Sequence, residues 1–172
     1  MVLCFLIAAA AIALDQITKL LVMQNIGKGA SVEVIRGVFH LTYTENRGAA
    51  FGMLSQHRWI FMLLSAVAIV AIFLYLWKEK PKSTLMRLSL GMILGGGIGN
   101  MIDRVIRGFV VDFIDIKFIP LWNYIFNVAD IFVCVGCGLL ILYLIRAEIQ
   151  EHRRKKADLQ KEPSHRQAGE DT

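Results

Sequence analysis

Long runs of apolar residues, separated by short polar joints, constrain this chain more than any other feature. A helix that crosses the hydrocarbon core of a bilayer needs about 20 predominantly apolar residues. Hydrophobic residues make up 56% of the 172-residue chain, which exceeds what one water-soluble domain of this size would bury. We therefore expect four transmembrane helices, at about residues 2–23, 59–77, 85–102 and 127–146.

Lysine and arginine residues indicate how these spans are oriented. They are concentrated in the joint after the second span and in the tail after the fourth, where residues 153–156 are all basic. Because cytoplasmic loops of membrane proteins carry an excess of Lys and Arg, both segments belong in the cytoplasm. Both termini are then cytoplasmic, and segments 24–58 and 103–126 lie on the extracytoplasmic side. No nucleic-acid-binding motif accompanies the basic run, so we expect no nucleic-acid partner.

The chain is predicted to form one membrane domain, residues 1–146, followed by a charged cytoplasmic tail, residues 147–172. In the first outer segment Phe39, Leu41 and Tyr43 alternate with polar residues, as in a half-buried strand. The expected fold class is an all-α membrane protein with four transmembrane helices and a small extracytoplasmic β-rich segment. The first apolar segment also resembles a secretory signal peptide. It lacks a basic N-terminal region, however, and its apolar pattern continues past the small residues, which favours a membrane span over a cleaved signal.

Small side chains in the spans are expected to serve helix packing. The third span carries glycines at four-residue intervals, which allow close approach of another helix: Gly91, Gly95 and Gly99. All three cysteines lie in apolar runs, and the C-x-x-C pair has no His or Cys nearby to complete a zinc site: Cys4, Cys134 and Cys137. We expect no metal and no other cofactor.

Polar and ionisable side chains are costly inside a membrane, so their positions point to function. They converge on the outer ends of the first, third and fourth spans: Asp15, Lys19, Asn100, Asp103, Arg104, Asp112, Asn127 and Asp130. Asp15 and Lys19 are four residues apart on one helix face, and they either neutralise each other or support the site. Arg104 does not face Asp103, which leaves Asp15, Asp112 or a substrate carbonyl as its partner.

Two of these carboxylates are the candidate catalytic groups. Asp112 lies in an apolar stretch, a setting that a solvated loop aspartate rarely needs. Asn127 is suited to cap the fourth helix, and Asp130 would then lie in its first turn, where the helix dipole and burial shift the pKa of Asp130 in opposite directions. Two such carboxylates brought together would share one proton and activate a water. Ser55 with His57 is a weaker scheme, because no carboxylate is placed to orient the histidine.

At these positions the chain resembles the lipoprotein signal peptidase family, also called signal peptidase II. The similarity covers about residues 10–132, in a fixed order of short motifs. These are Asp15-Gln16 with Thr18-Lys19, Asn46-Arg47-Gly48-Ala49-Ala50-Phe51-Gly52, Gly99-Asn100-Met101-Ile102-Asp103-Arg104, Val110-Val111-Asp112-Phe113, and Phe126-Asn127-Val128-Ala129-Asp130. Each motif is weak alone, but their order on four spans is specific.

The resemblance implies an aspartic endopeptidase of the bacterial cytoplasmic membrane with Asp112 and Asp130 as its dyad. Such an enzyme removes signal peptides from diacylglyceryl-modified prolipoproteins, cleaving before the lipidated cysteine at the extracytoplasmic face. It needs no metal and is inhibited by the cyclic peptide globomycin. The substrate site would be lined or shaped by Asn46, Gly48, Asn100, Arg104 and Asn127, with support from Asp15, Lys19 and Asp103.

Two other classes of function compete with this interpretation. A proton-coupled carrier or channel also uses intramembrane Asp, Asn and Arg, but it would distribute them across the depth of the membrane. Here they gather at one face, which favours an enzyme that works at the surface. A noncatalytic assembly factor could use the glycine face of the third span, but it would not require both Asp112 and Asp130.

Overall fold

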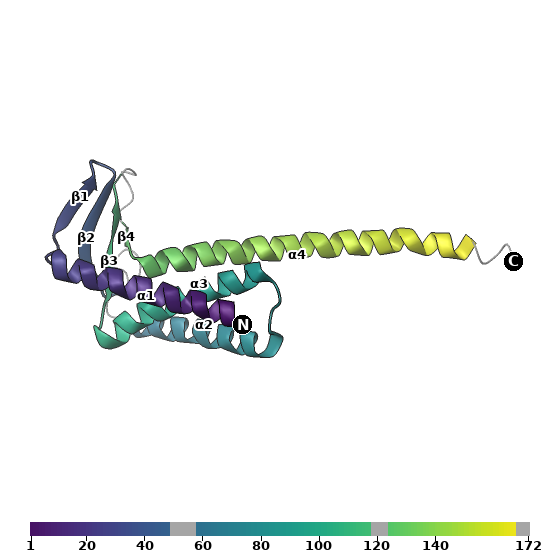
Figure 1. Ribbon diagram of the computed structural model, residues 1–172, viewed down its shortest axis with the longest axis horizontal. Coiled ribbons are helices and arrows are strands. Elements are labelled where there is room, and N and C mark those ends of the chain that lie inside the picture. Colours follow the sequence, from purple (N-terminus) through teal and green to yellow (C-terminus); the bar gives the residue numbers. More distant parts are fainter. Residues whose placement is uncertain (49–57, 118–123, 168–172) are drawn as a thin grey trace.

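Four helices and a small sheet make up the part of the protein that the structure describes (Figure 1). The structure, a computed structural model, describes residues 1–48, 58–117 and 124–167. In that part of the chain, four helices are long and apolar enough to cross a membrane. The predicted fold class is therefore confirmed. The helices are α1 (Val2–Asn25), α2 (Arg58–Glu79), α3 (Thr84–Ile106) and α4 (Val128–Gln167).

Helix α3 packs against each of the other three helices, and its glycines bring the backbones together. A Cβ atom on Gly91 or Gly95 would collide with backbone atoms of α1, and one on Gly96 would collide with the carbonyl oxygen of Ala129 in α4. The expected packing face of the third span is thus confirmed. This face holds α1 against α3, while the neighbouring Gly96 holds the start of α4 against α3.

We expect Gly96→Ala to destabilise the protein by about 1–3 kcal/mol, because the added methyl group forces α3 away from α4. Gly97→Ala is the matched control, since a Cβ there would lie 3.7 Å from Ile69, an ordinary van der Waals distance. Thermal unfolding of the purified variants in detergent measures the difference. Equal midpoints for the two variants would contradict the close contact at Gly96.

The sheet lies at one end of the helices (Figure 1). Its strands are antiparallel in the order β1-β2-β3-β4, and they span Ser31–Ile35, Phe39–Asn46, Val110–Ile116 and Ile125–Phe126. The predicted strand at residues 39–44 is therefore confirmed. An irregularity in the pairing of β2 with β3 falls between Leu41 and Thr44, just before Thr44 pairs with Asp112.

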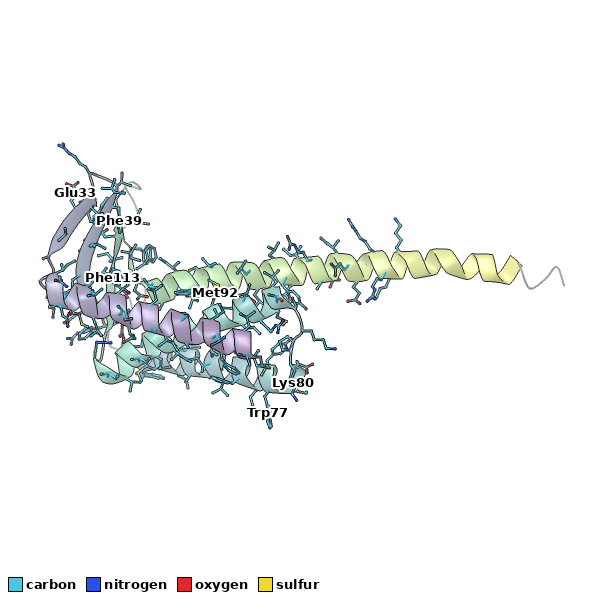
Figure 2. All side chains as sticks on the ribbon, in the orientation of Figure 1. Glu33, Phe39, Trp77, Lys80, Met92 and Phe113 are labelled. Atoms are coloured by element: carbon cyan, nitrogen blue, oxygen red, sulfur yellow. The ribbon has the colours of Figure 1, made fainter. Side chains whose placement is uncertain are left out.

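An apolar cluster attaches the sheet to the end of α1. It consists of Val22, Ile26, Tyr43, Val111 and Phe113, all buried. Figure 2 shows Phe113 where β3 meets α1. Burial of this cluster anchors β3, because residues on both sides of Asp112 lie in it.

Helix α4 continues well beyond the span expected from apolarity. The predicted span ends at residue 146, whereas the helix runs on through the basic segment to Gln167. Two ion pairs at i,i+4 spacing, Glu148 with His152 and Glu151 with Lys155, favour helix in this polar stretch. The charged tail thus begins as a continuation of α4.

Candidate active site

The sheet end of the bundle brings the polar side chains together from five parts of the chain. Asp112 lies on β3 and Asp130 in the first turn of α4. Asn46 ends β2, Asn100 lies near the end of α3, and Asn127 immediately precedes α4. The two aspartates are close enough for the charge of Asp130 to act on Asp112.

Asp112 is almost completely buried, with 3% of its surface exposed. Its Oδ1 accepts a hydrogen bond from Asn127 Nδ2 at 2.6 Å, and its Oδ2 accepts one from Asn46 Nδ2 at 2.9 Å. Burial raises the pKa of Asp112 to about 7, and the negative charge of Asp130 adds to this, while the two amide hydrogen bonds lower it. Asp112 therefore changes its charge near neutral pH.

Asp130 is both a site carboxylate and part of a helix cap. Its Oδ2 accepts from the backbone N–H of Asn127 at 3.2 Å, while Asn127 Oδ1 accepts from the backbone N–H of Asp130 at 3.0 Å. This reciprocal pair is a capping box, and it confirms the predicted cap at Asn127. The remaining oxygen, Oδ1, accepts from Asn100 Nδ2 at 2.8 Å. The cap thus determines where the carboxylate of Asp130 lies.

The Asn127 side chain links the two aspartates. Its Nδ2 donates to Asp112 Oδ1 and, at 3.1 Å, to Asn100 Oδ1. It is completely buried, and its own oxygen is held by the backbone of Asp130. One amide therefore connects β3, α3 and α4 at the dyad.

Asn46 and Gly48 form the edge of the site on the β2 side. Asn46 Oδ1 accepts from the backbone N–H of Gly48 at 3.0 Å, which leaves its Nδ2 directed to Asp112. Residues 49–52 of the motif that begins at Asn46, and also Ser55 and His57, lie outside the described residues. The alternative serine–histidine scheme therefore stays untested.

The ammonium group of Lys19 is fully buried next to the polar network that contains Asp112 and Asp130. Lys19 Nζ is 2.8 Å from Asp15 Oδ2, 2.8 Å from Asp103 Oδ2 and 3.0 Å from Asn100 Oδ1. The expected Asp15–Lys19 pair is thus formed, but as part of a larger cluster. A buried charge is tolerated only when it is paired and hydrogen-bonded, as it is here.

The two carboxylates that hold Lys19 also bind backbone groups beside the dyad. Asp15 Oδ1 accepts from the N–H of Ala129 at 2.9 Å, and Asp103 Oδ2 accepts from the N–H of Val111 at 3.2 Å. These N–H groups belong to the residues immediately before Asp130 and Asp112. The buried cluster thereby holds the backbone on which both aspartates stand.

Arg107 and Gln16 complete this cluster, and the sequence interpretation assigned them no role. Arg107 forms an ion pair with Asp103 and donates to Gln16 Oε1 at 3.1 Å. Gln16 Nε2 also reaches Asp103 Oδ1, at 3.3 Å. Arg107 lies four residues after Asp103, a helical spacing from which the pair could have been predicted.

Arg104 is the cation on the exposed side of the dyad. Its Nη1 donates to the backbone carbonyl of Asn100 at 3.2 Å, and its charge interacts with both Asp112 and Asp130. Within the described ranges 1–48, 58–117 and 124–156, it makes no ion pair closer than 4 Å. Its guanidinium is thus a candidate group for binding a ligand beside the two carboxylates.

Comparisons with known proteins agree with this geometry. The family described as signal peptidase (SPase) II matches residues 7–146 of the chain. The lipoprotein signal peptidase of Halothermothrix orenii is 43% identical over 84% of this chain and 96% of its own length, and that of Clostridioides difficile is 44% identical over 81% and 93%. A solved structure of a bacterial membrane enzyme superposes with a TM-score of 0.77 at 33% identity, covering 83% of this chain and 87% of that one. The chain therefore belongs to the signal peptidase II family of lipoprotein signal peptidases.

Proposed function

We propose that this protein is an aspartic endopeptidase that removes the signal peptide from diacylglyceryl-modified prolipoproteins, cleaving before the lipidated cysteine. The observation that carries the proposal is the pair of carboxylates, Asp112 and Asp130, which Asn127 joins by donating its side-chain N–H to Asp112 and its backbone N–H to Asp130. They lie on β3 and at the start of α4, at one end of the helices (Figure 1). The curated relatives are named lipoprotein signal peptidases, which defines the substrate class.

In the proposed mechanism Asp112 starts protonated and Asp130 starts ionised. Asp130 takes a proton from a water molecule as the water oxygen attacks the scissile carbonyl carbon, and Asp112 gives its proton to the carbonyl oxygen. When the tetrahedral intermediate collapses, the C–N bond breaks, the amide nitrogen receives the proton held by Asp130, and one hydroxyl group of the intermediate returns its proton to Asp112. The products are the signal peptide with a free carboxyl group and the lipidated cysteine with a free amino group.

The residues around the dyad have separate roles in this proposal. Asn46, Asn100 and Asn127 shape the substrate site by holding the carboxylates, while Arg104 and Gly48 line the side from which the precursor approaches. Asp15, Lys19 and Asp103 support it from within. Globomycin, as a peptide inhibitor, is expected to compete for the same place, and no metal is required.

We place the protein in the bacterial cytoplasmic membrane with both termini in the cytoplasm and the dyad at the extracytoplasmic face. Supporting this placement, Lys80 and the N-terminus lie at the end of the bundle opposite the sheet (Figures 1 and 2). The joint that contains Lys80 and the segment after Arg146 are both basic, as cytoplasmic flanks are.

Cysteine labelling tests this topology. We expect Lys80→Cys to react only with reagent that reaches the cytoplasm, and Arg36→Cys, at the turn after β1, to react from outside the cell. The measurements require a variant in which the three native cysteines are replaced by alanine: Cys4, Cys134 and Cys137. Labelling of Lys80→Cys from the external medium alone would reverse the placement.

Incubation of the purified protein with a lipidated precursor tests the function directly. We expect a shortened lipoprotein whose new N-terminus is the lipidated cysteine, and we expect globomycin to prevent its formation. Mass spectrometry of both products identifies the bond that was cut. A precursor that stays intact with correctly folded protein would contradict the proposed activity.

The pH dependence of cleavage follows from the environment of Asp112. Charged groups face it from three helices: Lys19 of α1, Arg104 of α3 and Asp130 of α4. Because the pKa of about 7 lies above the ordinary 3.8, the folded protein favours the protonated form. The stability that this supplies is present below pH 3.8 and lost as the pH rises through about 7. If Asp112 is the acid, kcat/KM is likewise expected to fall as the pH rises through about 7.

The Asn46 amide provides a test, because its removal is expected to change the pH at which kcat/KM falls. Its hydrogen bond lowers the pKa of Asp112, so Asn46→Ala is expected to shift the alkaline fall of kcat/KM to higher pH. Asn25→Ala is the matched control, because the Asn25 amide is exposed and donates to the backbone carbonyl of Leu21 in its own helix. An unshifted profile for Asn46→Ala would show that Asp112 does not control this limb.

A further inference from the structure

The buried ammonium of Lys19 is two hydrogen bonds away from the carboxylate of Asp130 and three away from that of Asp112. Its side chain has no exposed surface, so it cannot touch a precursor. The contact that leads toward the dyad is the one with Asn100 Oδ1, at 3.0 Å. From Asn100, one hydrogen bond continues to Asp130, and Asn127 connects the same oxygen to Asp112.

An amide group has distinct ends, and Lys19 determines which end of Asn100 faces which neighbour. The oxygen of Asn100 accepts from Lys19 and from Asn127 Nδ2, and its nitrogen donates to Asp130 Oδ1 at 2.8 Å. Reversal of the amide would place its N–H groups against two donors and its oxygen against a carboxylate. Every contact of the group would then be lost or repulsive.

We infer that Lys19 is a positioning residue for hydrolysis: its ammonium holds the Asn100 amide in the one orientation that donates a hydrogen bond to Asp130. This inference rests on the proposed dyad. Asp130 then receives two donors, Asn100 Nδ2 and the N–H of Asn127, and together they determine where its two carboxylate oxygens lie. Lys19 thus acts on Asp130 through Asn100 without touching either reacting group.

A purely structural role for Lys19 makes a different prediction. In that case the ammonium only neutralises Asp15 and Asp103, and a charge-balanced replacement restores full turnover. The test variant is therefore Lys19→Met combined with Asp15→Asn, which removes one charge of each sign and keeps an oxygen for the N–H of Ala129. Lys28→Met is the control, because Lys28 is an exposed lysine whose partner is Glu45.

We expect the charge-balanced variant to lose kcat by on the order of a hundredfold, the scale of a misplaced catalytic group. KM should stay within about twofold, because a buried side chain makes no substrate contact. Lys28→Met should retain the wild-type kcat. Lys19→Gln combined with Asp15→Asn should recover part of the lost kcat, since glutamine still offers an N–H to Asn100.

A double-mutant cycle with Asn100→Ala shows whether Lys19 acts through that amide. If it does, the charge-balanced change should cost less than about threefold in a protein that already lacks the Asn100 side chain. Independent structural damage would instead multiply the two losses. Multiplication, or a wild-type kcat in the charge-balanced variant, would overturn the inference.

Two further results distinguish failure of this inference from failure of the proposed dyad and from misfolding of the variants. Full activity of Asp112→Asn or Asp130→Asn would refute the proposed dyad itself, whereas loss there with normal kcat in the Lys19 variant would refute the inference alone. If the Lys19 variants do not fold, Asn100→Asp takes their place: it keeps the oxygen for Lys19 but offers no N–H to Asp130. Wild-type kcat in folded Asn100→Asp would overturn the inference, and a large loss with unchanged KM would support it.

Discussion

Asp112→Asn and Asp130→Asn are each expected to abolish precursor cleavage while leaving a folded, membrane-inserted protein that binds substrate. Asparagine has the size of aspartate and preserves some hydrogen bonding, but it cannot exchange a proton. General acid–base groups typically contribute about 10²–10⁴-fold to rate. Because both carboxylates act on one water, the double variant should lose little more activity than either single one.

The strand that carries Asp112 also offers a matched control. Asp115 is as deeply buried, with 2% exposed, but it bonds to Thr42 and Lys117 rather than to the dyad. Asp115→Asn should therefore retain cleavage if it folds. Asp103→Asn is a poorer control, because Asp103 pairs with Lys19 and Arg107.

Initial rates on a lipidated precursor, together with thermal unfolding midpoints, decide this prediction. Near-wild-type cleavage by either Asp112→Asn or Asp130→Asn would refute the dyad. Loss of cleavage with a normal unfolding midpoint would assign the loss to proton transfer rather than to packing.

A precursor whose lipobox cysteine lacks its diacylglyceryl group is expected to be cleaved on the order of a hundredfold less efficiently, because its scissile bond is no longer held at a defined depth. Each acyl methylene that enters the membrane contributes about 0.8 kcal/mol, so two chains supply much of the energy that positions the substrate. The dyad lies at one end of the membrane-spanning helices, where such a bond would be presented.

Competition between two precursors that differ only in the lipid measures this dependence as a ratio of kcat/KM. A soluble peptide with the same cleavage sequence controls for recognition of the peptide alone, and it should resemble the unlipidated precursor. Equal efficiencies for the lipidated and unlipidated precursors would contradict positioning by the acyl chains.

The sequence alone determined the four spans, because the cost of exposing polar backbone in a bilayer permits little except helices of about this length. It also predicted the candidate site residues, since Asp112, Asp130 and Lys19 stand in apolar surroundings where polar groups are costly. The cap at Asn127 was predictable because its partner is only three residues away. Contacts between residues three or four apart in a helix follow directly from their spacing in the sequence.

Only the tertiary structure decided how these residues are connected. Lys19 bonds to Asn100 across 81 residues of sequence, and Asn46 bonds to Asp112 across 66, so no local pattern specifies either contact. The hydrogen bond of Asp15 to Ala129 could not be predicted for the same reason, because 114 residues separate the two in the sequence. A sequence shows which polar groups the membrane makes costly, but only packing of α1, α3, α4 and β3 determines which group each one pairs with.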